Sequence, residues 1–144
     1  MVRNYVDAGG EPTNRKYARL DASGSFSDLT QSNASLHAVI LLNKENAGIL
    51  LHEFNKSNPA EKFTDQVLIK MKNPAGDEIE LNSSRGWNKA GGILIEQNNN
   101  DYSRFRIFML QNNGVINVEV HGDSSSVYRF DINASGFGDA LSQI

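Results

Sequence analysis

Three histidines are the residues of this chain best suited to metal binding or acid–base chemistry. They lie at positions 37, 52 and 121, and none has a carboxylate or another histidine at metal-ligand spacing. A zinc site normally needs three or four converging ligands. His37 and His52 lie in two successive apolar runs, so we expect them to face each other across a hairpin as a structural pair. The sequence therefore predicts no metal site and no cofactor.

The carboxylates give no clear catalytic pattern. Asp77, Glu78 and Glu80 lie close together, while Glu96 and Glu119 lie elsewhere. A glycosidase needs two acids at a set separation, and surface strands commonly carry alternating acids. The nucleophile elbow of serine hydrolases and the glycine-rich phosphate loop are both missing, and the chain contains no cysteine. We therefore expect no catalytic residue and a protein that is not an enzyme.

The loop at 83–92 is the best candidate for a binding site. It holds the only tryptophan, Trp87, beside Arg85, Asn88 and Lys89. A flat apolar ring next to forked hydrogen-bond donors is suited to a sugar. Tyr102 lies in the next expected turn and can join this site. The alternative is that Trp87 closes the end of the core, because tryptophan is usually mostly buried.

Composition limits the class of protein. The chain has 144 residues, 39% hydrophobic content and a net charge of -3, which fit one domain with a thin apolar supply. Mixed, weakly acidic charge argues against nucleic acid as a partner. No apolar run approaches a membrane span, and no signal peptide is visible, so we expect synthesis in the cytoplasm and no membrane insertion. The thin core favours completion against copies of the same chain.

Short apolar runs recur every ten to fifteen residues, with polar turns between them. We expect residues 1–16 to be an extended N-terminal segment and residues 17–144 to be a single β domain. Strands are predicted at 17–20, 36–42, 47–54, 67–72, 78–81, 93–96, 104–110, 114–120 and 127–132, with one short helical turn at 59–63. Such a pattern is typical of an antiparallel sandwich, a barrel or a fibre-like module. The prediction is an all-β fold, either an antiparallel β-sandwich or a fibre-like β module, with little helix.

The final hairpins give the most detailed expectations. Asn112-Asn113-Gly114 favours a tight turn between strands 104–110 and 114–120. In the last strand, alternation predicts one apolar face and one face with an Arg129–Asp131 pair. The apolar residues expected on one side of the last two strands are Ile116, Val118, Val120, Tyr128, Phe130 and Ile132.

A phrase near the start of the chain is repeated near its end. Residues 19–29 and 129–141 each read as Arg and Asp on a strand, then Ala-Ser-Gly, then Phe, Asp and Leu. We expect a strand, a turn at Ala-Ser-Gly and a second strand in each copy. With the seventeen asparagines and the stretch from Arg85 to Ile107, this phrase resembles segments of tailed-bacteriophage fibre and receptor-binding proteins. The resemblance implies a β-rich homotrimer in a virion tail, and no binding residue is carried over from it.

The expected function is therefore a non-enzymatic structural and adhesive module of a phage tail fibre or receptor-binding protein. It would form a homotrimer and contact a glycan or protein receptor on the host surface. One alternative is a monomeric, lectin-like carbohydrate-binding sandwich that uses Trp87. The other is a small protein that binds another protein, such as a toxin's inhibitor.

Overall fold

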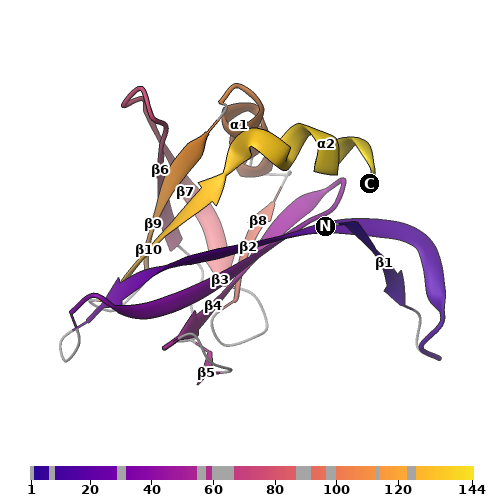
Figure 1. The fold of residues 1–144 in the computed structure, drawn as a ribbon, viewed down its shortest axis with the longest axis horizontal. Helices are drawn as coiled ribbons and strands as arrows, with labels where there is room; N and C mark the ends of the chain where they lie inside the picture. Colours follow the sequence, from indigo (N-terminus) through magenta and orange to yellow (C-terminus); the bar gives the residue numbers. More distant parts are fainter. Residues whose placement is uncertain are drawn as a thin grey trace.

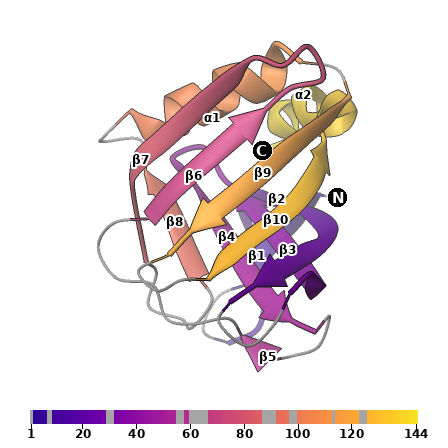
Figure 2. The same ribbon diagram turned by 90° about the vertical axis from the view of Figure 1, so that its left-hand side faces the viewer.

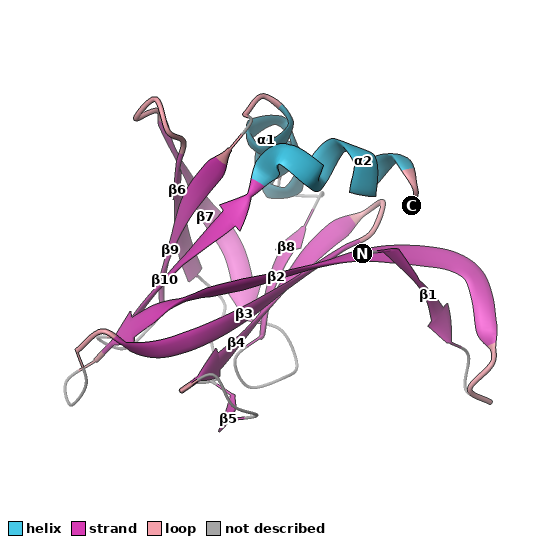
Figure 3. Cartoon of the chain, viewed as in Figure 1, coloured by secondary structure: helices cyan, strands magenta, loops and turns pink. Residues whose placement is uncertain are grey.

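The computed structural model describes residues 2–6, 9–28, 32–54, 58–59, 67–86, 92–96, 100–112, 114–122 and 126–144. Antiparallel strands dominate these residues, with two short helices and one 3₁₀ turn, so the all-β class is confirmed (Figure 3). The strands are β1 (Val2–Val6), β2 (Pro12–Ser27), β3 (Ala34–Leu42), β4 (Asn46–Glu53), β5 (Asn58–Pro59), β6 (Val67–Lys72), β7 (Glu78–Gly86), β8 (Gly92–Glu96), β9 (Val115–His121) and β10 (Val127–Asn133). The helical segments are α1 (Asp101–Leu110), the 3₁₀ turn η1 (Ala134–Gly136) and α2 (Phe137–Ser142).

The sheet closes on itself at β2. The strand order is β1-β2-β10-β9-β6-β7-β8-β4-β3, and β3 pairs again with β2. One edge of β2 pairs with β10 and the other with β3, so eight strands form a closed, barrel-like ring (Figure 2). The described strands do not divide into two facing sheets, so the sandwich arrangement is not found. The hairpin of β1 and the start of β2, which holds the described part of residues 1–16, projects from this ring (Figure 1).

Gly24 makes this closure possible. A Cβ atom built at Gly24 would lie 1.8 Å from the carbonyl oxygen of Arg129 on β10. The sequence prediction of a turn at Ala22-Ser23-Gly24 is wrong, because these residues lie inside the continuous strand β2. The glycine is required for the close approach of two backbones, not for a change of chain direction.

Alternating residues of the strands fill the ring. The buried residues of β9 and β10 are those predicted: Ile116, Val118, Val120, Tyr128, Phe130 and Ile132. The hairpin of β3 and β4 is also confirmed, and His37 pairs directly with His52. The predicted turn between β6 and β7 is present, with Gly76 at φ 92° and the Asp77 backbone N–H donating to Asn73 Oδ1 at 2.8 Å.

Helix α1 replaces a predicted strand. Residues 104–110 alternate polar and apolar only briefly, and their aromatic content favours a strand. The longer pattern is helical, because Tyr102, Phe105 and Met109 recur at spacings of three and four and are all buried. The predicted hairpin of 104–110 with 114–120 is therefore wrong. Both helices lie at one end of the ring (Figure 1).

The two copies of the repeated phrase fold differently. In the second copy, Ala134–Gly136 forms η1, and Phe137 begins α2 and packs edge-to-face on Phe105 at 5.8 Å between ring centroids. The expected Arg129–Asp131 pair is not formed. Arg129 Nε instead lies 3.2 Å from Glu119 Oε2, and Asn117 donates to Asp131. An Arg–Asp pair does occur in the first copy, between Arg19 and Asp21 at 2.9 Å.

The predicted helical turn at 59–63 lies outside the described residues, apart from Pro59 in β5. Neither described helix has the length and apolar character needed to cross a membrane.

Candidate functional site

A hollow of about 500 Å³ lies on the outer face of the ring, over β1 to β4 and β8. Its floor is apolar, because β3 and β4 are apolar on both sides: one set of side chains fills the core and the other faces outward. Gly48 lies opposite Leu41 and adds no side chain there. We call this feature the apolar hollow, and its lining is Asn4, Tyr17, Arg19, Val39, Leu41, Asn43, Asn46, Gly48, Leu50, His52 and Leu94.

The turn between β3 and β4 holds the polar rim of the apolar hollow in place. The Asn43 side-chain oxygen accepts hydrogen bonds from the backbone N–H groups of Glu45 at 2.8 Å and Asn46 at 2.9 Å. Such a turn fixes the local backbone through the side chain. The hydroxyl of buried Tyr102 donates to the Asn43 carbonyl at 2.5 Å. Helix α1, at the end of the ring, thus anchors the rim through the buried side chain of Tyr102.

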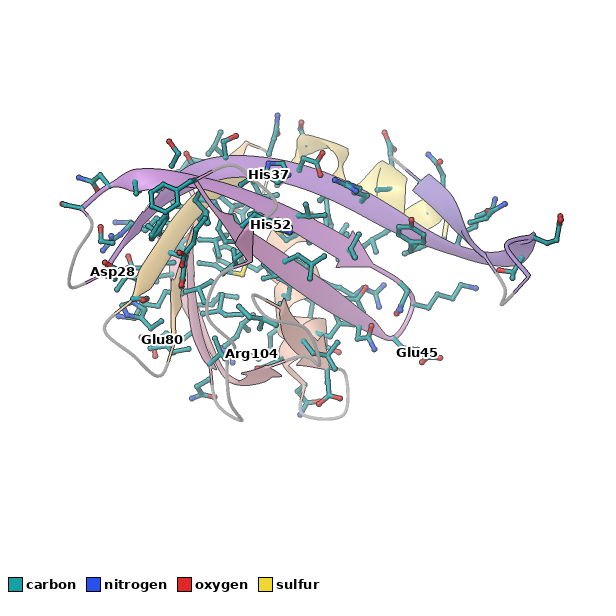
Figure 4. All side chains as sticks on the ribbon, turned by 90° about the horizontal axis from the view of Figure 1, so that it is seen from below. Asp28, His37, Glu45, His52, Glu80 and Arg104 are labelled. Carbon is teal, nitrogen blue, oxygen red and sulfur yellow. The ribbon has the colours of Figure 1, made fainter. Side chains whose placement is uncertain are left out.

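His52 lines the same hollow, and its cross-strand partner His37 lies beside it. The rings of His37 and His52 lie 6.1 Å apart between centroids (Figure 4). Burial lowers the pKa of His52, and the charges of His37 and Arg19 lower it further. His52 is therefore neutral at neutral pH. Arg19 Nε donates to Asp21 Oδ1 at 2.9 Å, so this rim cation has a carboxylate beside it.

A second hollow, of about 490 Å³, lies over β2, β10, β9, β6 and β7. We call it the charged hollow, and its lining is Ser23, Gly24, Ser25, Lys70, Lys72, Glu78, Asn117, Val118, Glu119, Arg129, Phe130 and Asp131. Opposite charges face each other across its strands, as Lys70 does with Glu80 and Glu119. These cross-strand pairs compensate one another and leave a face that water solvates well.

Glu119 lines the charged hollow and contacts two basic side chains. Its carboxylate contacts His121 Nε2 at 2.5 Å and Arg129 Nε at 3.2 Å. Burial by itself would raise the pKa of Glu119, but the His121 hydrogen bond and the Arg129 charge lower it overall. An ionised carboxylate with two basic partners is held in place as a structural group, and it is a poor proton donor at neutral pH.

The described part of the structure does not bring the predicted binding residues together in one site. Trp87, Asn88 and Lys89 lie outside the described residues. Arg85 lies in β7, where its backbone is the register partner of Leu94, a residue of the apolar hollow. Tyr102 is not in a turn but in α1, with its side chain fully buried behind Asn43.

Sequence reasoning missed most of the apolar hollow. Tyr17, Asn46 and Leu50 were not singled out, because the hollow is assembled from strands far apart in the chain. The available signal was the pair of near-continuous apolar runs at 36–42 and 47–54, because such strands place apolar side chains on both of their faces.

Chemically, the two hollows offer surfaces for binding. In the described part of the chain, no group of three or more His, Cys, Asp or Glu side chains is arranged to hold a metal ion. An apolar floor bordered by amides and a phenol can take a ligand that has both an apolar face and hydroxyl groups.

Comparison with known proteins gives no family assignment. No protein-family model matches this sequence, and no curated protein or solved structure is significantly similar to the chain. Function must therefore be inferred from the geometry of the described residues.

Proposed function

We propose that this chain is a non-enzymatic adhesive module that binds a carbohydrate in the apolar hollow. The supporting observation is the combination of Leu41 and Leu50 on the floor with Tyr17, Asn43 and Asn46 at the rim. Sugars present C–H faces that pack on aromatic and aliphatic surfaces, and hydroxyls that pair with amides. The volume of about 500 Å³ is in the range of small-molecule sites.

The biological setting that we propose is a bacteriophage tail fibre or receptor-binding protein. The asparagine-rich turns support this setting, as does the all-β fold. The module would be made in the bacterial cytoplasm, become part of the virion tail and attach to a glycan on the host surface.

The test is a glycan array probed with the tag-free chain, followed by calorimetric titration of the best ligand. Tyr17→Ala and Asn46→Ala should each weaken binding at least tenfold, because each removes a contact from the rim. Asn117→Ala in the charged hollow is the matched control and should bind normally. Absence of binding to every glycan, or equal losses in all three variants, would refute the proposal.

Trp87, Asn88 and Lys89, predicted from the sequence as binding residues, are a second candidate for the same ligand, and Trp87→Ala tests them in the same assay. If these residues take part, this variant should lose glycan binding and keep the circular dichroism spectrum of the native chain. Loss of the native spectrum would assign Trp87 to the core, and unchanged binding would exclude Trp87 from the site.

A homotrimer is the assembly that we propose for this module. Ring closure gives each strand within it a neighbour on both sides, so the proposed trimer does not depend on covering an open edge of the sheet. The exposed apolar side chains of Ile107, Leu110 and Val115, at the helical end, are a surface that subunits can bury. Light scattering at micromolar concentration should give three times the chain mass, and Ile107→Lys with Leu110→Lys should reduce it. A strict monomer would contradict the proposed trimer without affecting the glycan proposal.

A further inference from the structure

We infer that His37 and His52 form a transition-metal site on the outer face of β3 and β4. The two residues are direct cross-strand partners, and their rings lie 6.1 Å apart between centroids, with planes tilted by 35°. Figure 4 shows both rings on the same side of neighbouring strands. This inference does not depend on the glycan proposal. The purely structural pair expected from the sequence is the competing interpretation.

The separation of the rings fits a shared ion. A metal bound to an imidazole nitrogen at about 2.1 Å lies roughly 3.2 Å from the ring centre, so two ligating rings have centres at most about 6.5 Å apart. The observed 6.1 Å is inside this limit. Because both residues lie within strands of the closed ring, the backbone already holds the rings at bridging distance, and side-chain rotation alone can complete the site.

One ring nitrogen has unused binding capacity. Nδ1 of His52 is buried and has no hydrogen-bond partner among the described residues. Buried nitrogens are normally hydrogen-bonded, and an unsatisfied one costs on the order of 1–3 kcal/mol. A bound metal would use a lone pair of this ring. Metals bind the neutral form of imidazole, in which one ring nitrogen carries a free lone pair.

The surrounding charges permit a cation. Arg19 is close enough to lower the pKa of His52, but its guanidinium donates to Asp21 at 2.9 Å, and this carboxylate offsets its charge. Across the described residues no third protein ligand completes the pair. Water would therefore fill the remaining positions of the ion. A site of two imidazoles follows the general order of divalent affinities, so Cu²⁺ should bind more tightly than Ni²⁺ or Zn²⁺.

The experiment is calorimetric titration of CuCl₂ and ZnCl₂ into the tag-free, chelator-treated full chain at neutral pH. We expect one Cu²⁺ per chain and weaker Zn²⁺ binding. His37→Asn and His52→Asn should each lower the Cu²⁺ affinity at least tenfold. His121→Asn is the matched control, because His121 lies beside Glu119 on the other face, and its variant should bind like the native chain.

Two further readouts separate metal binding from a structural role. Cu²⁺ should raise the melting temperature of the native chain and of His121→Asn, but not of His37→Asn or His52→Asn, because only a ligand of the folded state stabilises it. In NMR spectra, substoichiometric Cu²⁺ should broaden the ring signals of His37 and His52 first. Equal Cu²⁺ affinity in all four proteins, a loss confined to His121→Asn, or broadening that starts elsewhere would overturn the inference.

Discussion

The apolar hollow and the charged hollow lie on two outer faces of the same closed sheet, and their volumes are nearly equal, at about 500 and 490 Å³. They differ in the kind of side chain that faces the solvent. On the charged face, apolar side chains point inward and charges point outward, and Glu119 already has partners in His121 and Arg129. On the apolar face, β3 and β4 place apolar side chains on both sides. Size alone therefore does not identify a binding site here; the composition of the outward residues does.

The largest effect should come from breaking the ring that carries both faces. Gly24→Ala places a methyl group against the Arg129 carbonyl, where backbone atoms must move. We expect a loss of about 3 kcal/mol or more in the free energy of unfolding, measured by urea denaturation. Gly136→Ala is the control: its Cβ meets nothing within 4 Å, and its φ is -97°. Its change should be within about 0.5 kcal/mol. Equal stability of the two variants would show that closure at Gly24 is not tight.

A smaller loss of stability should come from a substitution that perturbs the apolar face and leaves the charged face unchanged. Tyr102→Phe removes the hydroxyl that donates to the Asn43 carbonyl at 2.5 Å, in a partly buried position. We expect a loss of about 1–2 kcal/mol in the free energy of unfolding. Chemical shifts should change at Asn43 and Asn46 on the apolar face and stay constant at Asn117 on the charged face. Changes spread over both faces would mean that α1 does not act locally on the rim.

The charged face should respond weakly and through salt. Glu119→Gln removes the ionic partner of Arg129 and His121 on a partly exposed surface, and we expect a loss of about 0.5–1 kcal/mol at low ionic strength. The loss should shrink in about 1 M NaCl, where charges are screened. Val39→Ala on the apolar face is the contrast, since Val39 is only 4% exposed although it lines the outer hollow. Its cost should not shrink with salt. The same salt response in both variants would contradict the distinction between the faces.

The smallest effect should be a pH dependence of the free energy of unfolding, caused by His52 on the apolar face. The pKa of His52 is lowered in the folded chain, so below the unfolded value of about 6.5 the unfolded state binds more protons. The free energy of unfolding should therefore decrease as the pH falls from 7 towards 5. Melting temperatures across this range should show a shallower slope for His52→Gln than for the native chain. Parallel slopes would mean that His52 does not contribute.

Local patterns were enough to predict much of the ring. The alternation of β9 and β10, the hairpin of β3 and β4, and the Asn73–Asp77 turn all follow from neighbouring residues. Two predictions were wrong because the structure at those positions depends on residues that are distant along the chain. Gly24 was interpreted by its freedom to turn, whereas its small size against β10 is what matters. Residues 104–110 were assigned to a strand, whereas the end of the ring needed a helix whose aromatic side chains fill it.

The candidate site was harder to predict for the same reason. Tyr17, Leu41 and Leu94 line the apolar hollow together, yet they come from separate strands. Only the strand order brings them to one face, and that order depends on pairings such as Arg19 with Leu41 and Gly48 with Leu94. The sequence did indicate two-faced strands at 36–54, but not which of their faces would stay outside.

The pairing of Val127 with Ser27 joins positions that are 100 residues apart. During synthesis, β2 leaves the ribosome long before β10 has been made. Until then the edge of β2 that will bind β10 is unpaired and can pair with other chains. Folding of such a topology should be slow, because the pairing of β10 with β2 that closes the ring joins residues far apart along the chain. Ring closure therefore depends on β10, one of the last segments to be synthesised. A chain that lacks β10 would keep an unpaired edge on β2 and would be prone to aggregation.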